Sequence, residues 1–247
     1  MMRFAILAAS LLAGSALAQG APEPSMAPQL PPGYLAPEAA MASAVMLPPP
    51  PARNSPAEIA DRYLYALSAR GIGGPDWVAA TEQISIQAPA FQKALTCAIG
   101  KLPGPATRKL LARTAADFVP PMAAAKAKFN RPRPFTTDKG QACDPETADG
   151  VGAALGMAYP SGHSGIGWLW ALTLADALPA RANEIRAFGK GTGDLRVACR
   201  VHWMSDVQNG RVLAVSIHEK QRATPAFQAD LAAARAELEA AETLRCE

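Results

Sequence analysis

Hydrophobic residues along most of this chain recur at helical spacing, which predicts a series of helices joined by short turns. The expected helices cover residues 75–84, 87–101, 105–129, 163–179, 182–190, 205–221 and 225–243. Another helix begins after Ser55, because Ser55-Pro56-Ala57-Glu58 reads as a capping box with proline at the first helical position. No stretch shows a convincing alternation of apolar and polar residues, as a half-buried strand would. We therefore expect an all-α fold.

Several residues refine these helices. Tyr63, Leu64 and Leu67 form an apolar stripe on the helix after Ser55. Pro120-Pro121 should break the helix at 105–129, because proline lacks the backbone N–H that the helix needs. Ser205 or Asp206 is a candidate N-cap, and Thr224-Pro225 marks another helix start.

The most apolar stretch, Gly165 to Ala175, ends at Asp176 and is too short to cross a bilayer. We therefore expect a soluble protein that does not bind a membrane. The segment from Arg131 to Gly150 is rich in Asp, Thr and Pro, so we expect a loop that limits access to a site.

The N-terminal residues 1–18 read as a secretory signal peptide. Arg3 supplies the positive end, Phe4 to Leu12 the apolar stretch, and Ala16-Leu17-Ala18 a cleavage site. Export predicts a periplasmic or secreted protein.

Proline dominates the next segment, residues 19–54, since 11 of the 23 prolines lie between Pro22 and Pro56. Composition favours a linker or disordered arm, whereas Tyr34, Leu35 and the run Val45 to Leu47 offer apolar anchors. Residues 55–247 are long enough for one domain with a sizeable core.

Composition excludes some partners and leaves the cysteine pairing open. The net charge of +3, one unit of which belongs to Arg3, is too small to favour nucleic acid or an anionic membrane. Four cysteines in an exported chain predict one or two disulfides, and three complete pairings of Cys97, Cys143, Cys199 and Cys246 are possible. Their spacing does not suggest zinc, and we expect neither a metal nor another cofactor.

Three short clusters carry the candidate chemistry. Lys126 with Arg133, and later Arg196, supply cations suited to the oxygens of a phosphate group. Ser161-Gly162 at a helix start can point backbone N–H groups at the same anion.

Two histidines add proton transfer and nucleophilic attack. Asp206 lies one helical turn after His202, so it can accept the Nδ1 proton and leave Nε2 free as a nucleophile. His163 is a second imidazole able to move protons. Together the clusters predict a metal-free phosphoryl-transfer site.

Their spacing resembles the signature of the type 2 phosphatidic acid phosphatase superfamily, which includes vanadium haloperoxidases. Lys126 precedes Arg133-Pro134 by seven positions, Pro160-Ser161-Gly162-His163 follows, and Arg196, His202 and Asp206 complete the pattern. The resemblance implies a single helical-bundle domain over residues 55–247.

Within that superfamily the chain is most similar to the bacterial class A non-specific acid phosphatases. The similarity runs from about Tyr34 to Ala240 and includes the run Met46 to Pro51 and the stretch His202 to Val207. It implies that residues 19–54 pack on the body rather than act as a linker. It also implies a metal-independent acid phosphatase of broad specificity, and it favours a homodimer.

The resemblance assigns roles to the candidate residues. His202 is the nucleophile that forms a phosphohistidine, His163 the general acid, and Asp206 the group that orients His202; helix capping is the competing role for Asp206. The phosphate is bound by Lys126, Arg133, Ser161, Gly162 and Arg196.

This chain departs from the family pattern in two places. Leu195 replaces a usual Ser, which removes a hydroxyl near the phosphate, and Arg200 replaces a common Gly. We expect Arg200 at the mouth of the site or in solvent, and Lys128 and Arg131 in solvent. His218 lacks a partner at motif spacing and is expected to be structural.

Two other functions remain open. A vanadate-dependent haloperoxidase would use the same anion pocket, with His202 as a ligand to vanadium. A phosphate-binding protein with little turnover would explain Leu195. Small phosphomonoesters are the expected substrates in the favoured function, and a site built around phosphate says little about the leaving group.

Overall fold

The computed structural model describes residues 30–144 and 157–246, and within these ranges the regular structure is helical with no β-strand. This confirms the all-α prediction. The α-helices are α1 (Pro37–Met41), α2 (Pro56–Ser68), α3 (Pro75–Glu82), α4 (Pro89–Ile99), α5 (Pro105–Phe129), α6 (Pro134–Thr137), α8 (Gly162–Ala177), α9 (Ala182–Ala198), α10 (Met204–Arg222) and α11 (Pro225–Ala240). Short 3-10 helices lie at η1 (Ala42–Met46), η2 (Ala69–Gly71) and η4 (Pro179–Arg181).

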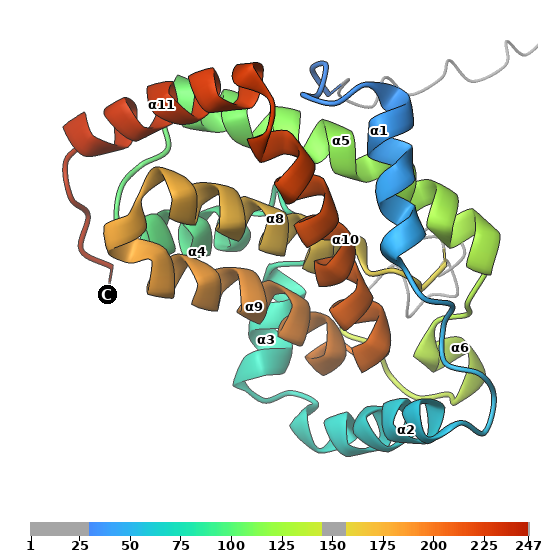
Figure 1. The fold of residues 1–247 in the computed structure, drawn as a ribbon. Helices are drawn as coiled ribbons and strands as arrows, with labels where there is room; N and C mark the ends of the chain where they lie inside the picture. The colour runs from blue at the N-terminus through green and yellow to red at the C-terminus, as the bar shows by residue number, and fades with distance from the viewer. Residues whose placement is uncertain (1–29, 145–156, 247) are drawn as a thin grey trace, which may run out of the picture.

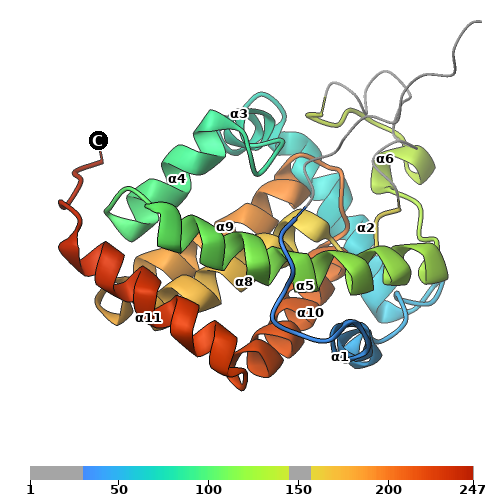
Figure 2. The ribbon, with the colours of Figure 1, turned by 90° about the horizontal axis from the view of Figure 1, so that it is seen from above.

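Helix α8 lies at the centre of the fold. It packs against α9 and α10 and also contacts α5 and α11, as Figure 1 shows. Seen from above, α5 crosses over α8 and α9, with α11 beside it (Figure 2). Nearly every turn of α8 is buried, which explains why its sequence is apolar on all sides.

Small residues allow α8 and α9 to approach closely. A Cβ atom added at Gly167 of α8 would lie 2.6 Å from Cγ2 of Thr192, and one at Gly189 of α9 would lie 2.4 Å from Cβ of Ala171. Side chains at these positions would force the two helices apart. The glycines therefore set the distance between the helices that carry His163 and Arg196.

Two helix predictions were wrong. Helix α5 continues without interruption through Pro120 and Pro121, because Phe118, Pro121 and Ala125 are buried and tertiary packing holds both halves in line. Helix α9 does not end at 190 but continues to Ala198, and Gly189 and Gly193 act as packing positions rather than helix breakers.

The face of α2 that packs inward also differs from the prediction. Tyr63 and Leu67 of the expected apolar stripe are 66% and 38% exposed, whereas Asp61 and Tyr65 are buried. The start of α2 follows the prediction, since the Ser55 hydroxyl accepts a hydrogen bond from the Glu58 N–H at 3.2 Å. The polar residue Asp61 faces inward because it has partners there, which are described below.

The proline-rich segment lies against the helices from residue 30 onward. The Tyr34 N–H donates to Asp117 of α5 at 2.9 Å, and the hydroxyl of Tyr159 donates to the Pro48 carbonyl at 2.5 Å. Leu47 is buried in the main core. The predicted signal peptide lies outside the described residues.

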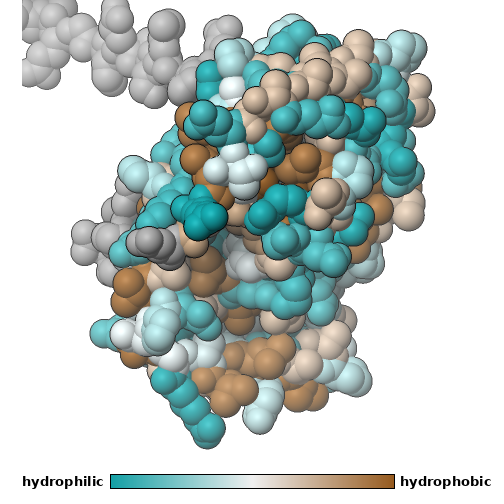
Figure 3. All heavy atoms as spheres, turned by 90° about the vertical axis from the view of Figure 1, so that its left-hand side faces the viewer, coloured by the Kyte–Doolittle hydropathy of each residue, from teal (hydrophilic) through white to brown (hydrophobic). Residues whose placement is uncertain are grey.

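Two disulfides use all four cysteines, Cys97 with Cys246 and Cys143 with Cys199. In the part of the chain that the structure describes, no helix is both long and apolar enough to cross a membrane. One face of the molecule mixes hydrophilic residues with scattered apolar ones (Figure 3).

Candidate active site

The predicted site residues come from five parts of the fold that meet where α8, α9 and α10 pack together. Lys126 lies in the last turn of α5, and Arg133 precedes α6. The start of α8 supplies Ser161, Gly162 and His163, the last turn of α9 supplies Arg196, and His202 and Asp206 flank the start of α10. The Ser161 N–H donates to the Asp206 carbonyl at 3.0 Å, which joins the start of α8 to the start of α10.

His202 is buried, with its two ring nitrogens facing opposite kinds of group. Nε2 lies 3.4 Å from Nη1 of Arg133, and Nδ1 lies 3.5 Å from Oδ2 of Asp206. Nδ1 has no shorter polar contact among the described residues, and catalytic hydrogen bonds are often long before substrate binds. Burial, and then the positive charges of Arg133 and Lys126, hold the pKa of His202 well below its usual value. The ring is therefore neutral, with Nε2 directed toward a cation.

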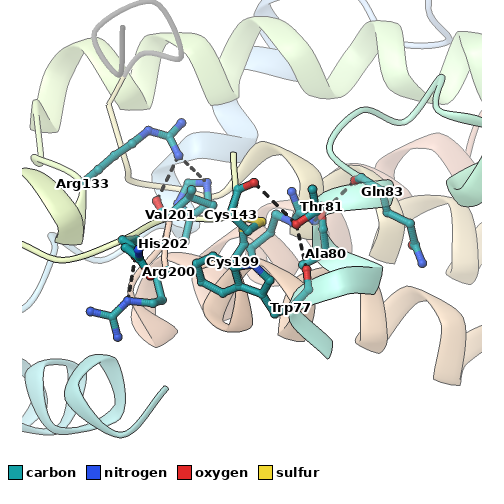
Figure 4. Close-up of a disulfide and its surroundings, with 12 residues drawn as sticks. Trp77, Ala80, Thr81, Gln83, Arg133, Cys143, Cys199, Arg200, Val201 and His202 are labelled. Atoms are coloured by element: carbon teal, nitrogen blue, oxygen red, sulfur yellow. Dashed lines mark hydrogen bonds between the residues drawn. A yellow bond between two sulfur atoms is a disulfide. The ribbon is translucent and has the colours of Figure 1, made fainter. Parts of the chain in front are cut away.

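Backbone carbonyls hold the two arginines in place. Arg133 Nη1 donates to the Val201 carbonyl at 3.0 Å, so its guanidinium lies beside His202 (Figure 4). Arg196 Nη2 donates to the Ala80 carbonyl of α3 at 2.9 Å, and its buried Nε has no partner among the described residues. Lys126 Nζ donates to the Met157 carbonyl.

Positive charge is concentrated in this cluster of side chains. Burial and the neighbouring Arg133 lower the pKa of Lys126 to about 7. Burial lowers the pKa of Arg196 to about 10, and it also lowers that of Arg133. Neighbouring like charges in a desolvated site disfavour one another, and a bound anion would relieve this cost.

His163 lies in the first turn of α8, half-buried and close to the same cations. Burial, followed by the charge of Arg196, lowers its pKa to about 3, against a hydrogen bond with the backbone of Ile84. Its Nε2 is buried and has no hydrogen-bond partner among the described residues. A bound anion would offset the charge of Arg196 and so raise this pKa.

Ser161 is the N-cap of α8, and its hydroxyl accepts from the Ser164 N–H at 3.4 Å. Gly162 is the first residue of the helix. The first N–H groups of a helix lack partners within it, and the helix dipole there favours an anion.

The carboxylate of Asp206 lies beside both His202 and the first residues of α10. Its Oδ2 lies near His202 and also accepts from the Trp203 N–H at 2.8 Å, which caps the start of α10. The N-cap residue is Trp203 and not Ser205 or Asp206, but Asp206 caps the helix from its third position. Burial raises the pKa of Asp206 to about 6, and Arg131 opposes this rise.

Arg131 and Arg200, which we expected in solvent or at the mouth, are instead held inside by long-range contacts. Arg131 forms ion pairs with Asp206 at 2.5 Å and with Asp61 at 2.8 Å. Arg200 has φ of +66°, where glycine fits best, and donates to the carbonyls of Tyr65 and Gln141. Neither burial could be read from local sequence.

Leu195 packs against the small apolar cluster around Cys143 and Cys199. Its side chain therefore contributes packing where the family usually has a hydroxyl. Lys128 is exposed, as expected.

His218 lies on α10 with Nε2 3.2 Å from Asp176, so it supports the structure away from the cation cluster. No group of three or more His, Cys, Asp or Glu within the described ranges is arranged to hold a metal ion.

Comparison with known proteins agrees with the residue pattern. The sequence profile of the PAP2 superfamily matches residues 106–218. The chain is 33% identical over 211 residues to the non-specific acid phosphatase of Salmonella typhimurium, covering 83% of each chain. It is 32% identical to an acid phosphatase of Zymomonas mobilis, covering 80% of this chain and 75% of the relative. A non-specific acid phosphatase of Providencia stuartii is 31% identical, covering 83% of this chain and 84% of the relative.

Proposed function

The chain belongs to the PAP2 superfamily and is an acid phosphatase, and we propose that it hydrolyses small phosphate monoesters through a phosphohistidine without a metal ion. The observation that carries this proposal is the position of His202. Its Nε2 faces Arg133 in the cation cluster, while Nδ1 faces Asp206. A nucleophilic imidazole needs an anion-binding group on one side and a proton acceptor on the other.

In the first step Nε2 of His202 attacks phosphorus, the N–P bond forms and the ester P–O bond breaks. Nδ1–H donates to Asp206, whose negative charge stabilises the positive charge that develops on the ring. In the second step water attacks phosphorus, the N–P bond breaks, and phosphate leaves.

His163 gives its proton to the leaving oxygen in the first step and takes one from water in the second. Its pKa of about 3 is too low for this task near neutral pH. A phosphoryl dianion beside Arg196 would offset the cations that lower this pKa, so substrate binding itself would charge His163. Acidic conditions favour that protonated form, in agreement with the name of the relatives.

Lys126, Arg133 and Arg196 would bind the phosphoryl oxygens, together with Ser161 and Gly162 at the start of α8. Three buried or half-buried cations supply the positive charge that metal ions supply in other phosphoryl-transfer sites. We therefore propose that the reaction does not require a metal ion.

We further propose export by the leader at residues 1–18, and a broad range of phosphomonoesters without nucleic-acid or membrane partners. Two disulfides fit an oxidising compartment. A homodimer is the assembly proposed from the resemblance.

The test is hydrolysis of p-nitrophenyl phosphate by the mature protein in EDTA, beside His202→Ala and the control His218→Gln. The control also alters a buried histidine with a carboxylate neighbour. We expect turnover in EDTA, inhibition by vanadate, and loss of turnover only in His202→Ala. Rapid quenching in base should trap phosphate on the wild-type protein.

Loss of turnover in EDTA would refute the metal-free mechanism. Turnover in His202→Ala would refute the nucleophile. Fast oxidation of bromide by peroxide after loading with vanadate would instead favour the haloperoxidase function.

A further inference from the structure

A chain of buried charges links the candidate nucleophile's carboxylate to helix α2. Asp206 Oδ1 lies 2.5 Å from Nη1 of Arg131, and Nη2 of Arg131 lies 2.8 Å from Oδ2 of Asp61. The side chains of Asp206, Arg131 and Asp61 are 0%, 10% and 4% exposed. One arginine thus bridges two carboxylates in a site with little solvent screening.

Asp61 holds this arrangement through Ser205 as well. It accepts from the Ser205 N–H at 2.9 Å and from the Ser205 hydroxyl at 2.5 Å, and that hydroxyl also accepts from Arg131 at 2.7 Å. Arg131 lies over the ring of Trp203, 5.3 Å from its centroid. The arginine is fixed on three sides, so its position relative to Asp206 is set by α2 and by the start of α10.

We propose that Arg131 and Asp61 are positioning residues: Arg131 keeps Asp206 ionised and oriented toward Nδ1 of His202, and Asp61 holds Arg131 in that position. This inference rests on the proposed function, in which Asp206 must accept the Nδ1–H hydrogen bond. A protonated Asp206 would no longer stabilise the positive ring, so turnover should fall at pH values where Asp206 takes up a proton.

The two residues act on Asp206 in opposite directions. Burial raises the pKa of Asp206, the charge of Arg131 lowers it, and the charge of Asp61 raises it. The other groups that face Asp206 are His202, Lys126, Arg133 and the phenol of Tyr159. Neither Arg131→Gln nor Asp61→Asn alters these groups, so each substitution removes one charge near Asp206.

The experiment compares the pH dependence of kcat/KM for p-nitrophenyl phosphate in the wild type, Arg131→Gln and Asp61→Asn. The acidic limb is the part of this pH profile in which kcat/KM falls as the pH is lowered. In Arg131→Gln it should move to higher pH by about one to three units, which is the usual change in pKa when a carboxylate loses an adjacent arginine. In Asp61→Asn, which keeps the shape of the side chain, the limb should move to lower pH by a smaller amount. The ionisation of the substrate is common to all three proteins and cannot cause a difference between them.

Matched controls come from a second carboxylate held by arginine, Asp230 with Arg113, which are 2.7 Å apart and join α11 to α5. Arg113→Gln and Asp230→Asn should lower thermal stability without moving the acidic limb. Arg131→Lys, which keeps a cation, should shift the limb less than Arg131→Gln.

Opposite shifts in the two variants support the proposal. Loss of activity without a shift, or shifts in the same direction, overturns it. If Arg131→Gln does not fold, Asp61→Asn decides: a limb at lower pH supports the proposal, and an unmoved or higher limb overturns it.

Trapping of phosphohistidine tests the role of His202 as nucleophile separately from the positioning roles of Arg131 and Asp61. A trapped intermediate in the wild type with unmoved limbs overturns the roles of Arg131 and Asp61 alone. If no phosphohistidine is trapped, the nucleophile is wrong and the positioning roles fail with it.

Discussion

The two disulfides should have different effects on stability and on catalysis. Cys143 and Cys199 are separated by 56 residues, and Cys97 and Cys246 by 149. Loop-closure entropy in the unfolded chain predicts a stabilisation of about 4 kcal/mol for the first bond and about 5 kcal/mol for the second. On the basis of loop length alone, removing Cys97–Cys246 should lower the free energy of unfolding at least as much as removing Cys143–Cys199 does.

Their positions predict the opposite order for activity. Cys199 lies between Arg196 and His202, and its carbonyl accepts a hydrogen bond from the Cys143 N–H at 3.0 Å. Figure 4 shows this disulfide between α3 and the loop that carries His202. The other disulfide ties the C-terminal tail to α4, and Cys246 is exposed.

The assay measures urea unfolding and kcat for two double variants, Cys143→Ala/Cys199→Ala and Cys97→Ala/Cys246→Ala, under non-reducing conditions. We expect the first to lower kcat by about ten-fold to a hundred-fold, since small displacements of catalytic groups have effects of this size. We expect the second to keep the wild-type kcat while its free energy of unfolding falls by several kcal/mol. Wild-type kcat in the first variant, or an equal loss of kcat in both, would refute this reasoning.

Three further predictions concern charge and packing. Relative to Lys126→Arg, which stays charged, the wild type should lose affinity for inorganic phosphate above pH about 7, because Lys126 loses its proton as the pH rises through its lowered pKa. Inhibition constants measured for both proteins across this range test this, since the ionisation of phosphate itself is common to both. Gly189→Ala should destabilise the protein by about 1 to 3 kcal/mol, since the new Cβ lies 2.4 Å from Ala171, whereas Gly191→Ala in the same helix meets nothing within 4 Å and should stabilise it slightly in thermal unfolding. Leu195→Ser should lower the melting temperature without raising kcat, because it removes packing beside a disulfide; a clear gain in kcat would show that the missing hydroxyl matters.

The protonation states of the site residues determine the pH range in which the enzyme should be active. Acidic conditions keep Lys126 charged and favour the protonated form of His163. The same acidic conditions also favour protonation of Asp206, because burial raises its pKa. The activity should therefore have an acidic limit set by Asp206 and a limit near neutral pH set by Lys126 and His163.

Local sequence was sufficient to predict most helices and to select the residues of the candidate site. Helix periodicity, the Ser55 cap and the Thr224 cap depend on residues a few positions apart, and the structure shows both caps. The catalytic motifs could also be recognised, because each consists of residues at short, fixed spacing along the chain.

The sequence could not predict features that depend on distant partners. Helix α5 passes through Pro120-Pro121 because its two halves are held by burial, and the cysteines pair across 56 and 149 residues. Asp61 and Arg131 look like ordinary surface charges until α2 is placed beside the start of α10. The sequence by itself determined which side chains are candidates for the chemistry, whereas the tertiary structure decided which charges lose their water and therefore how those side chains titrate.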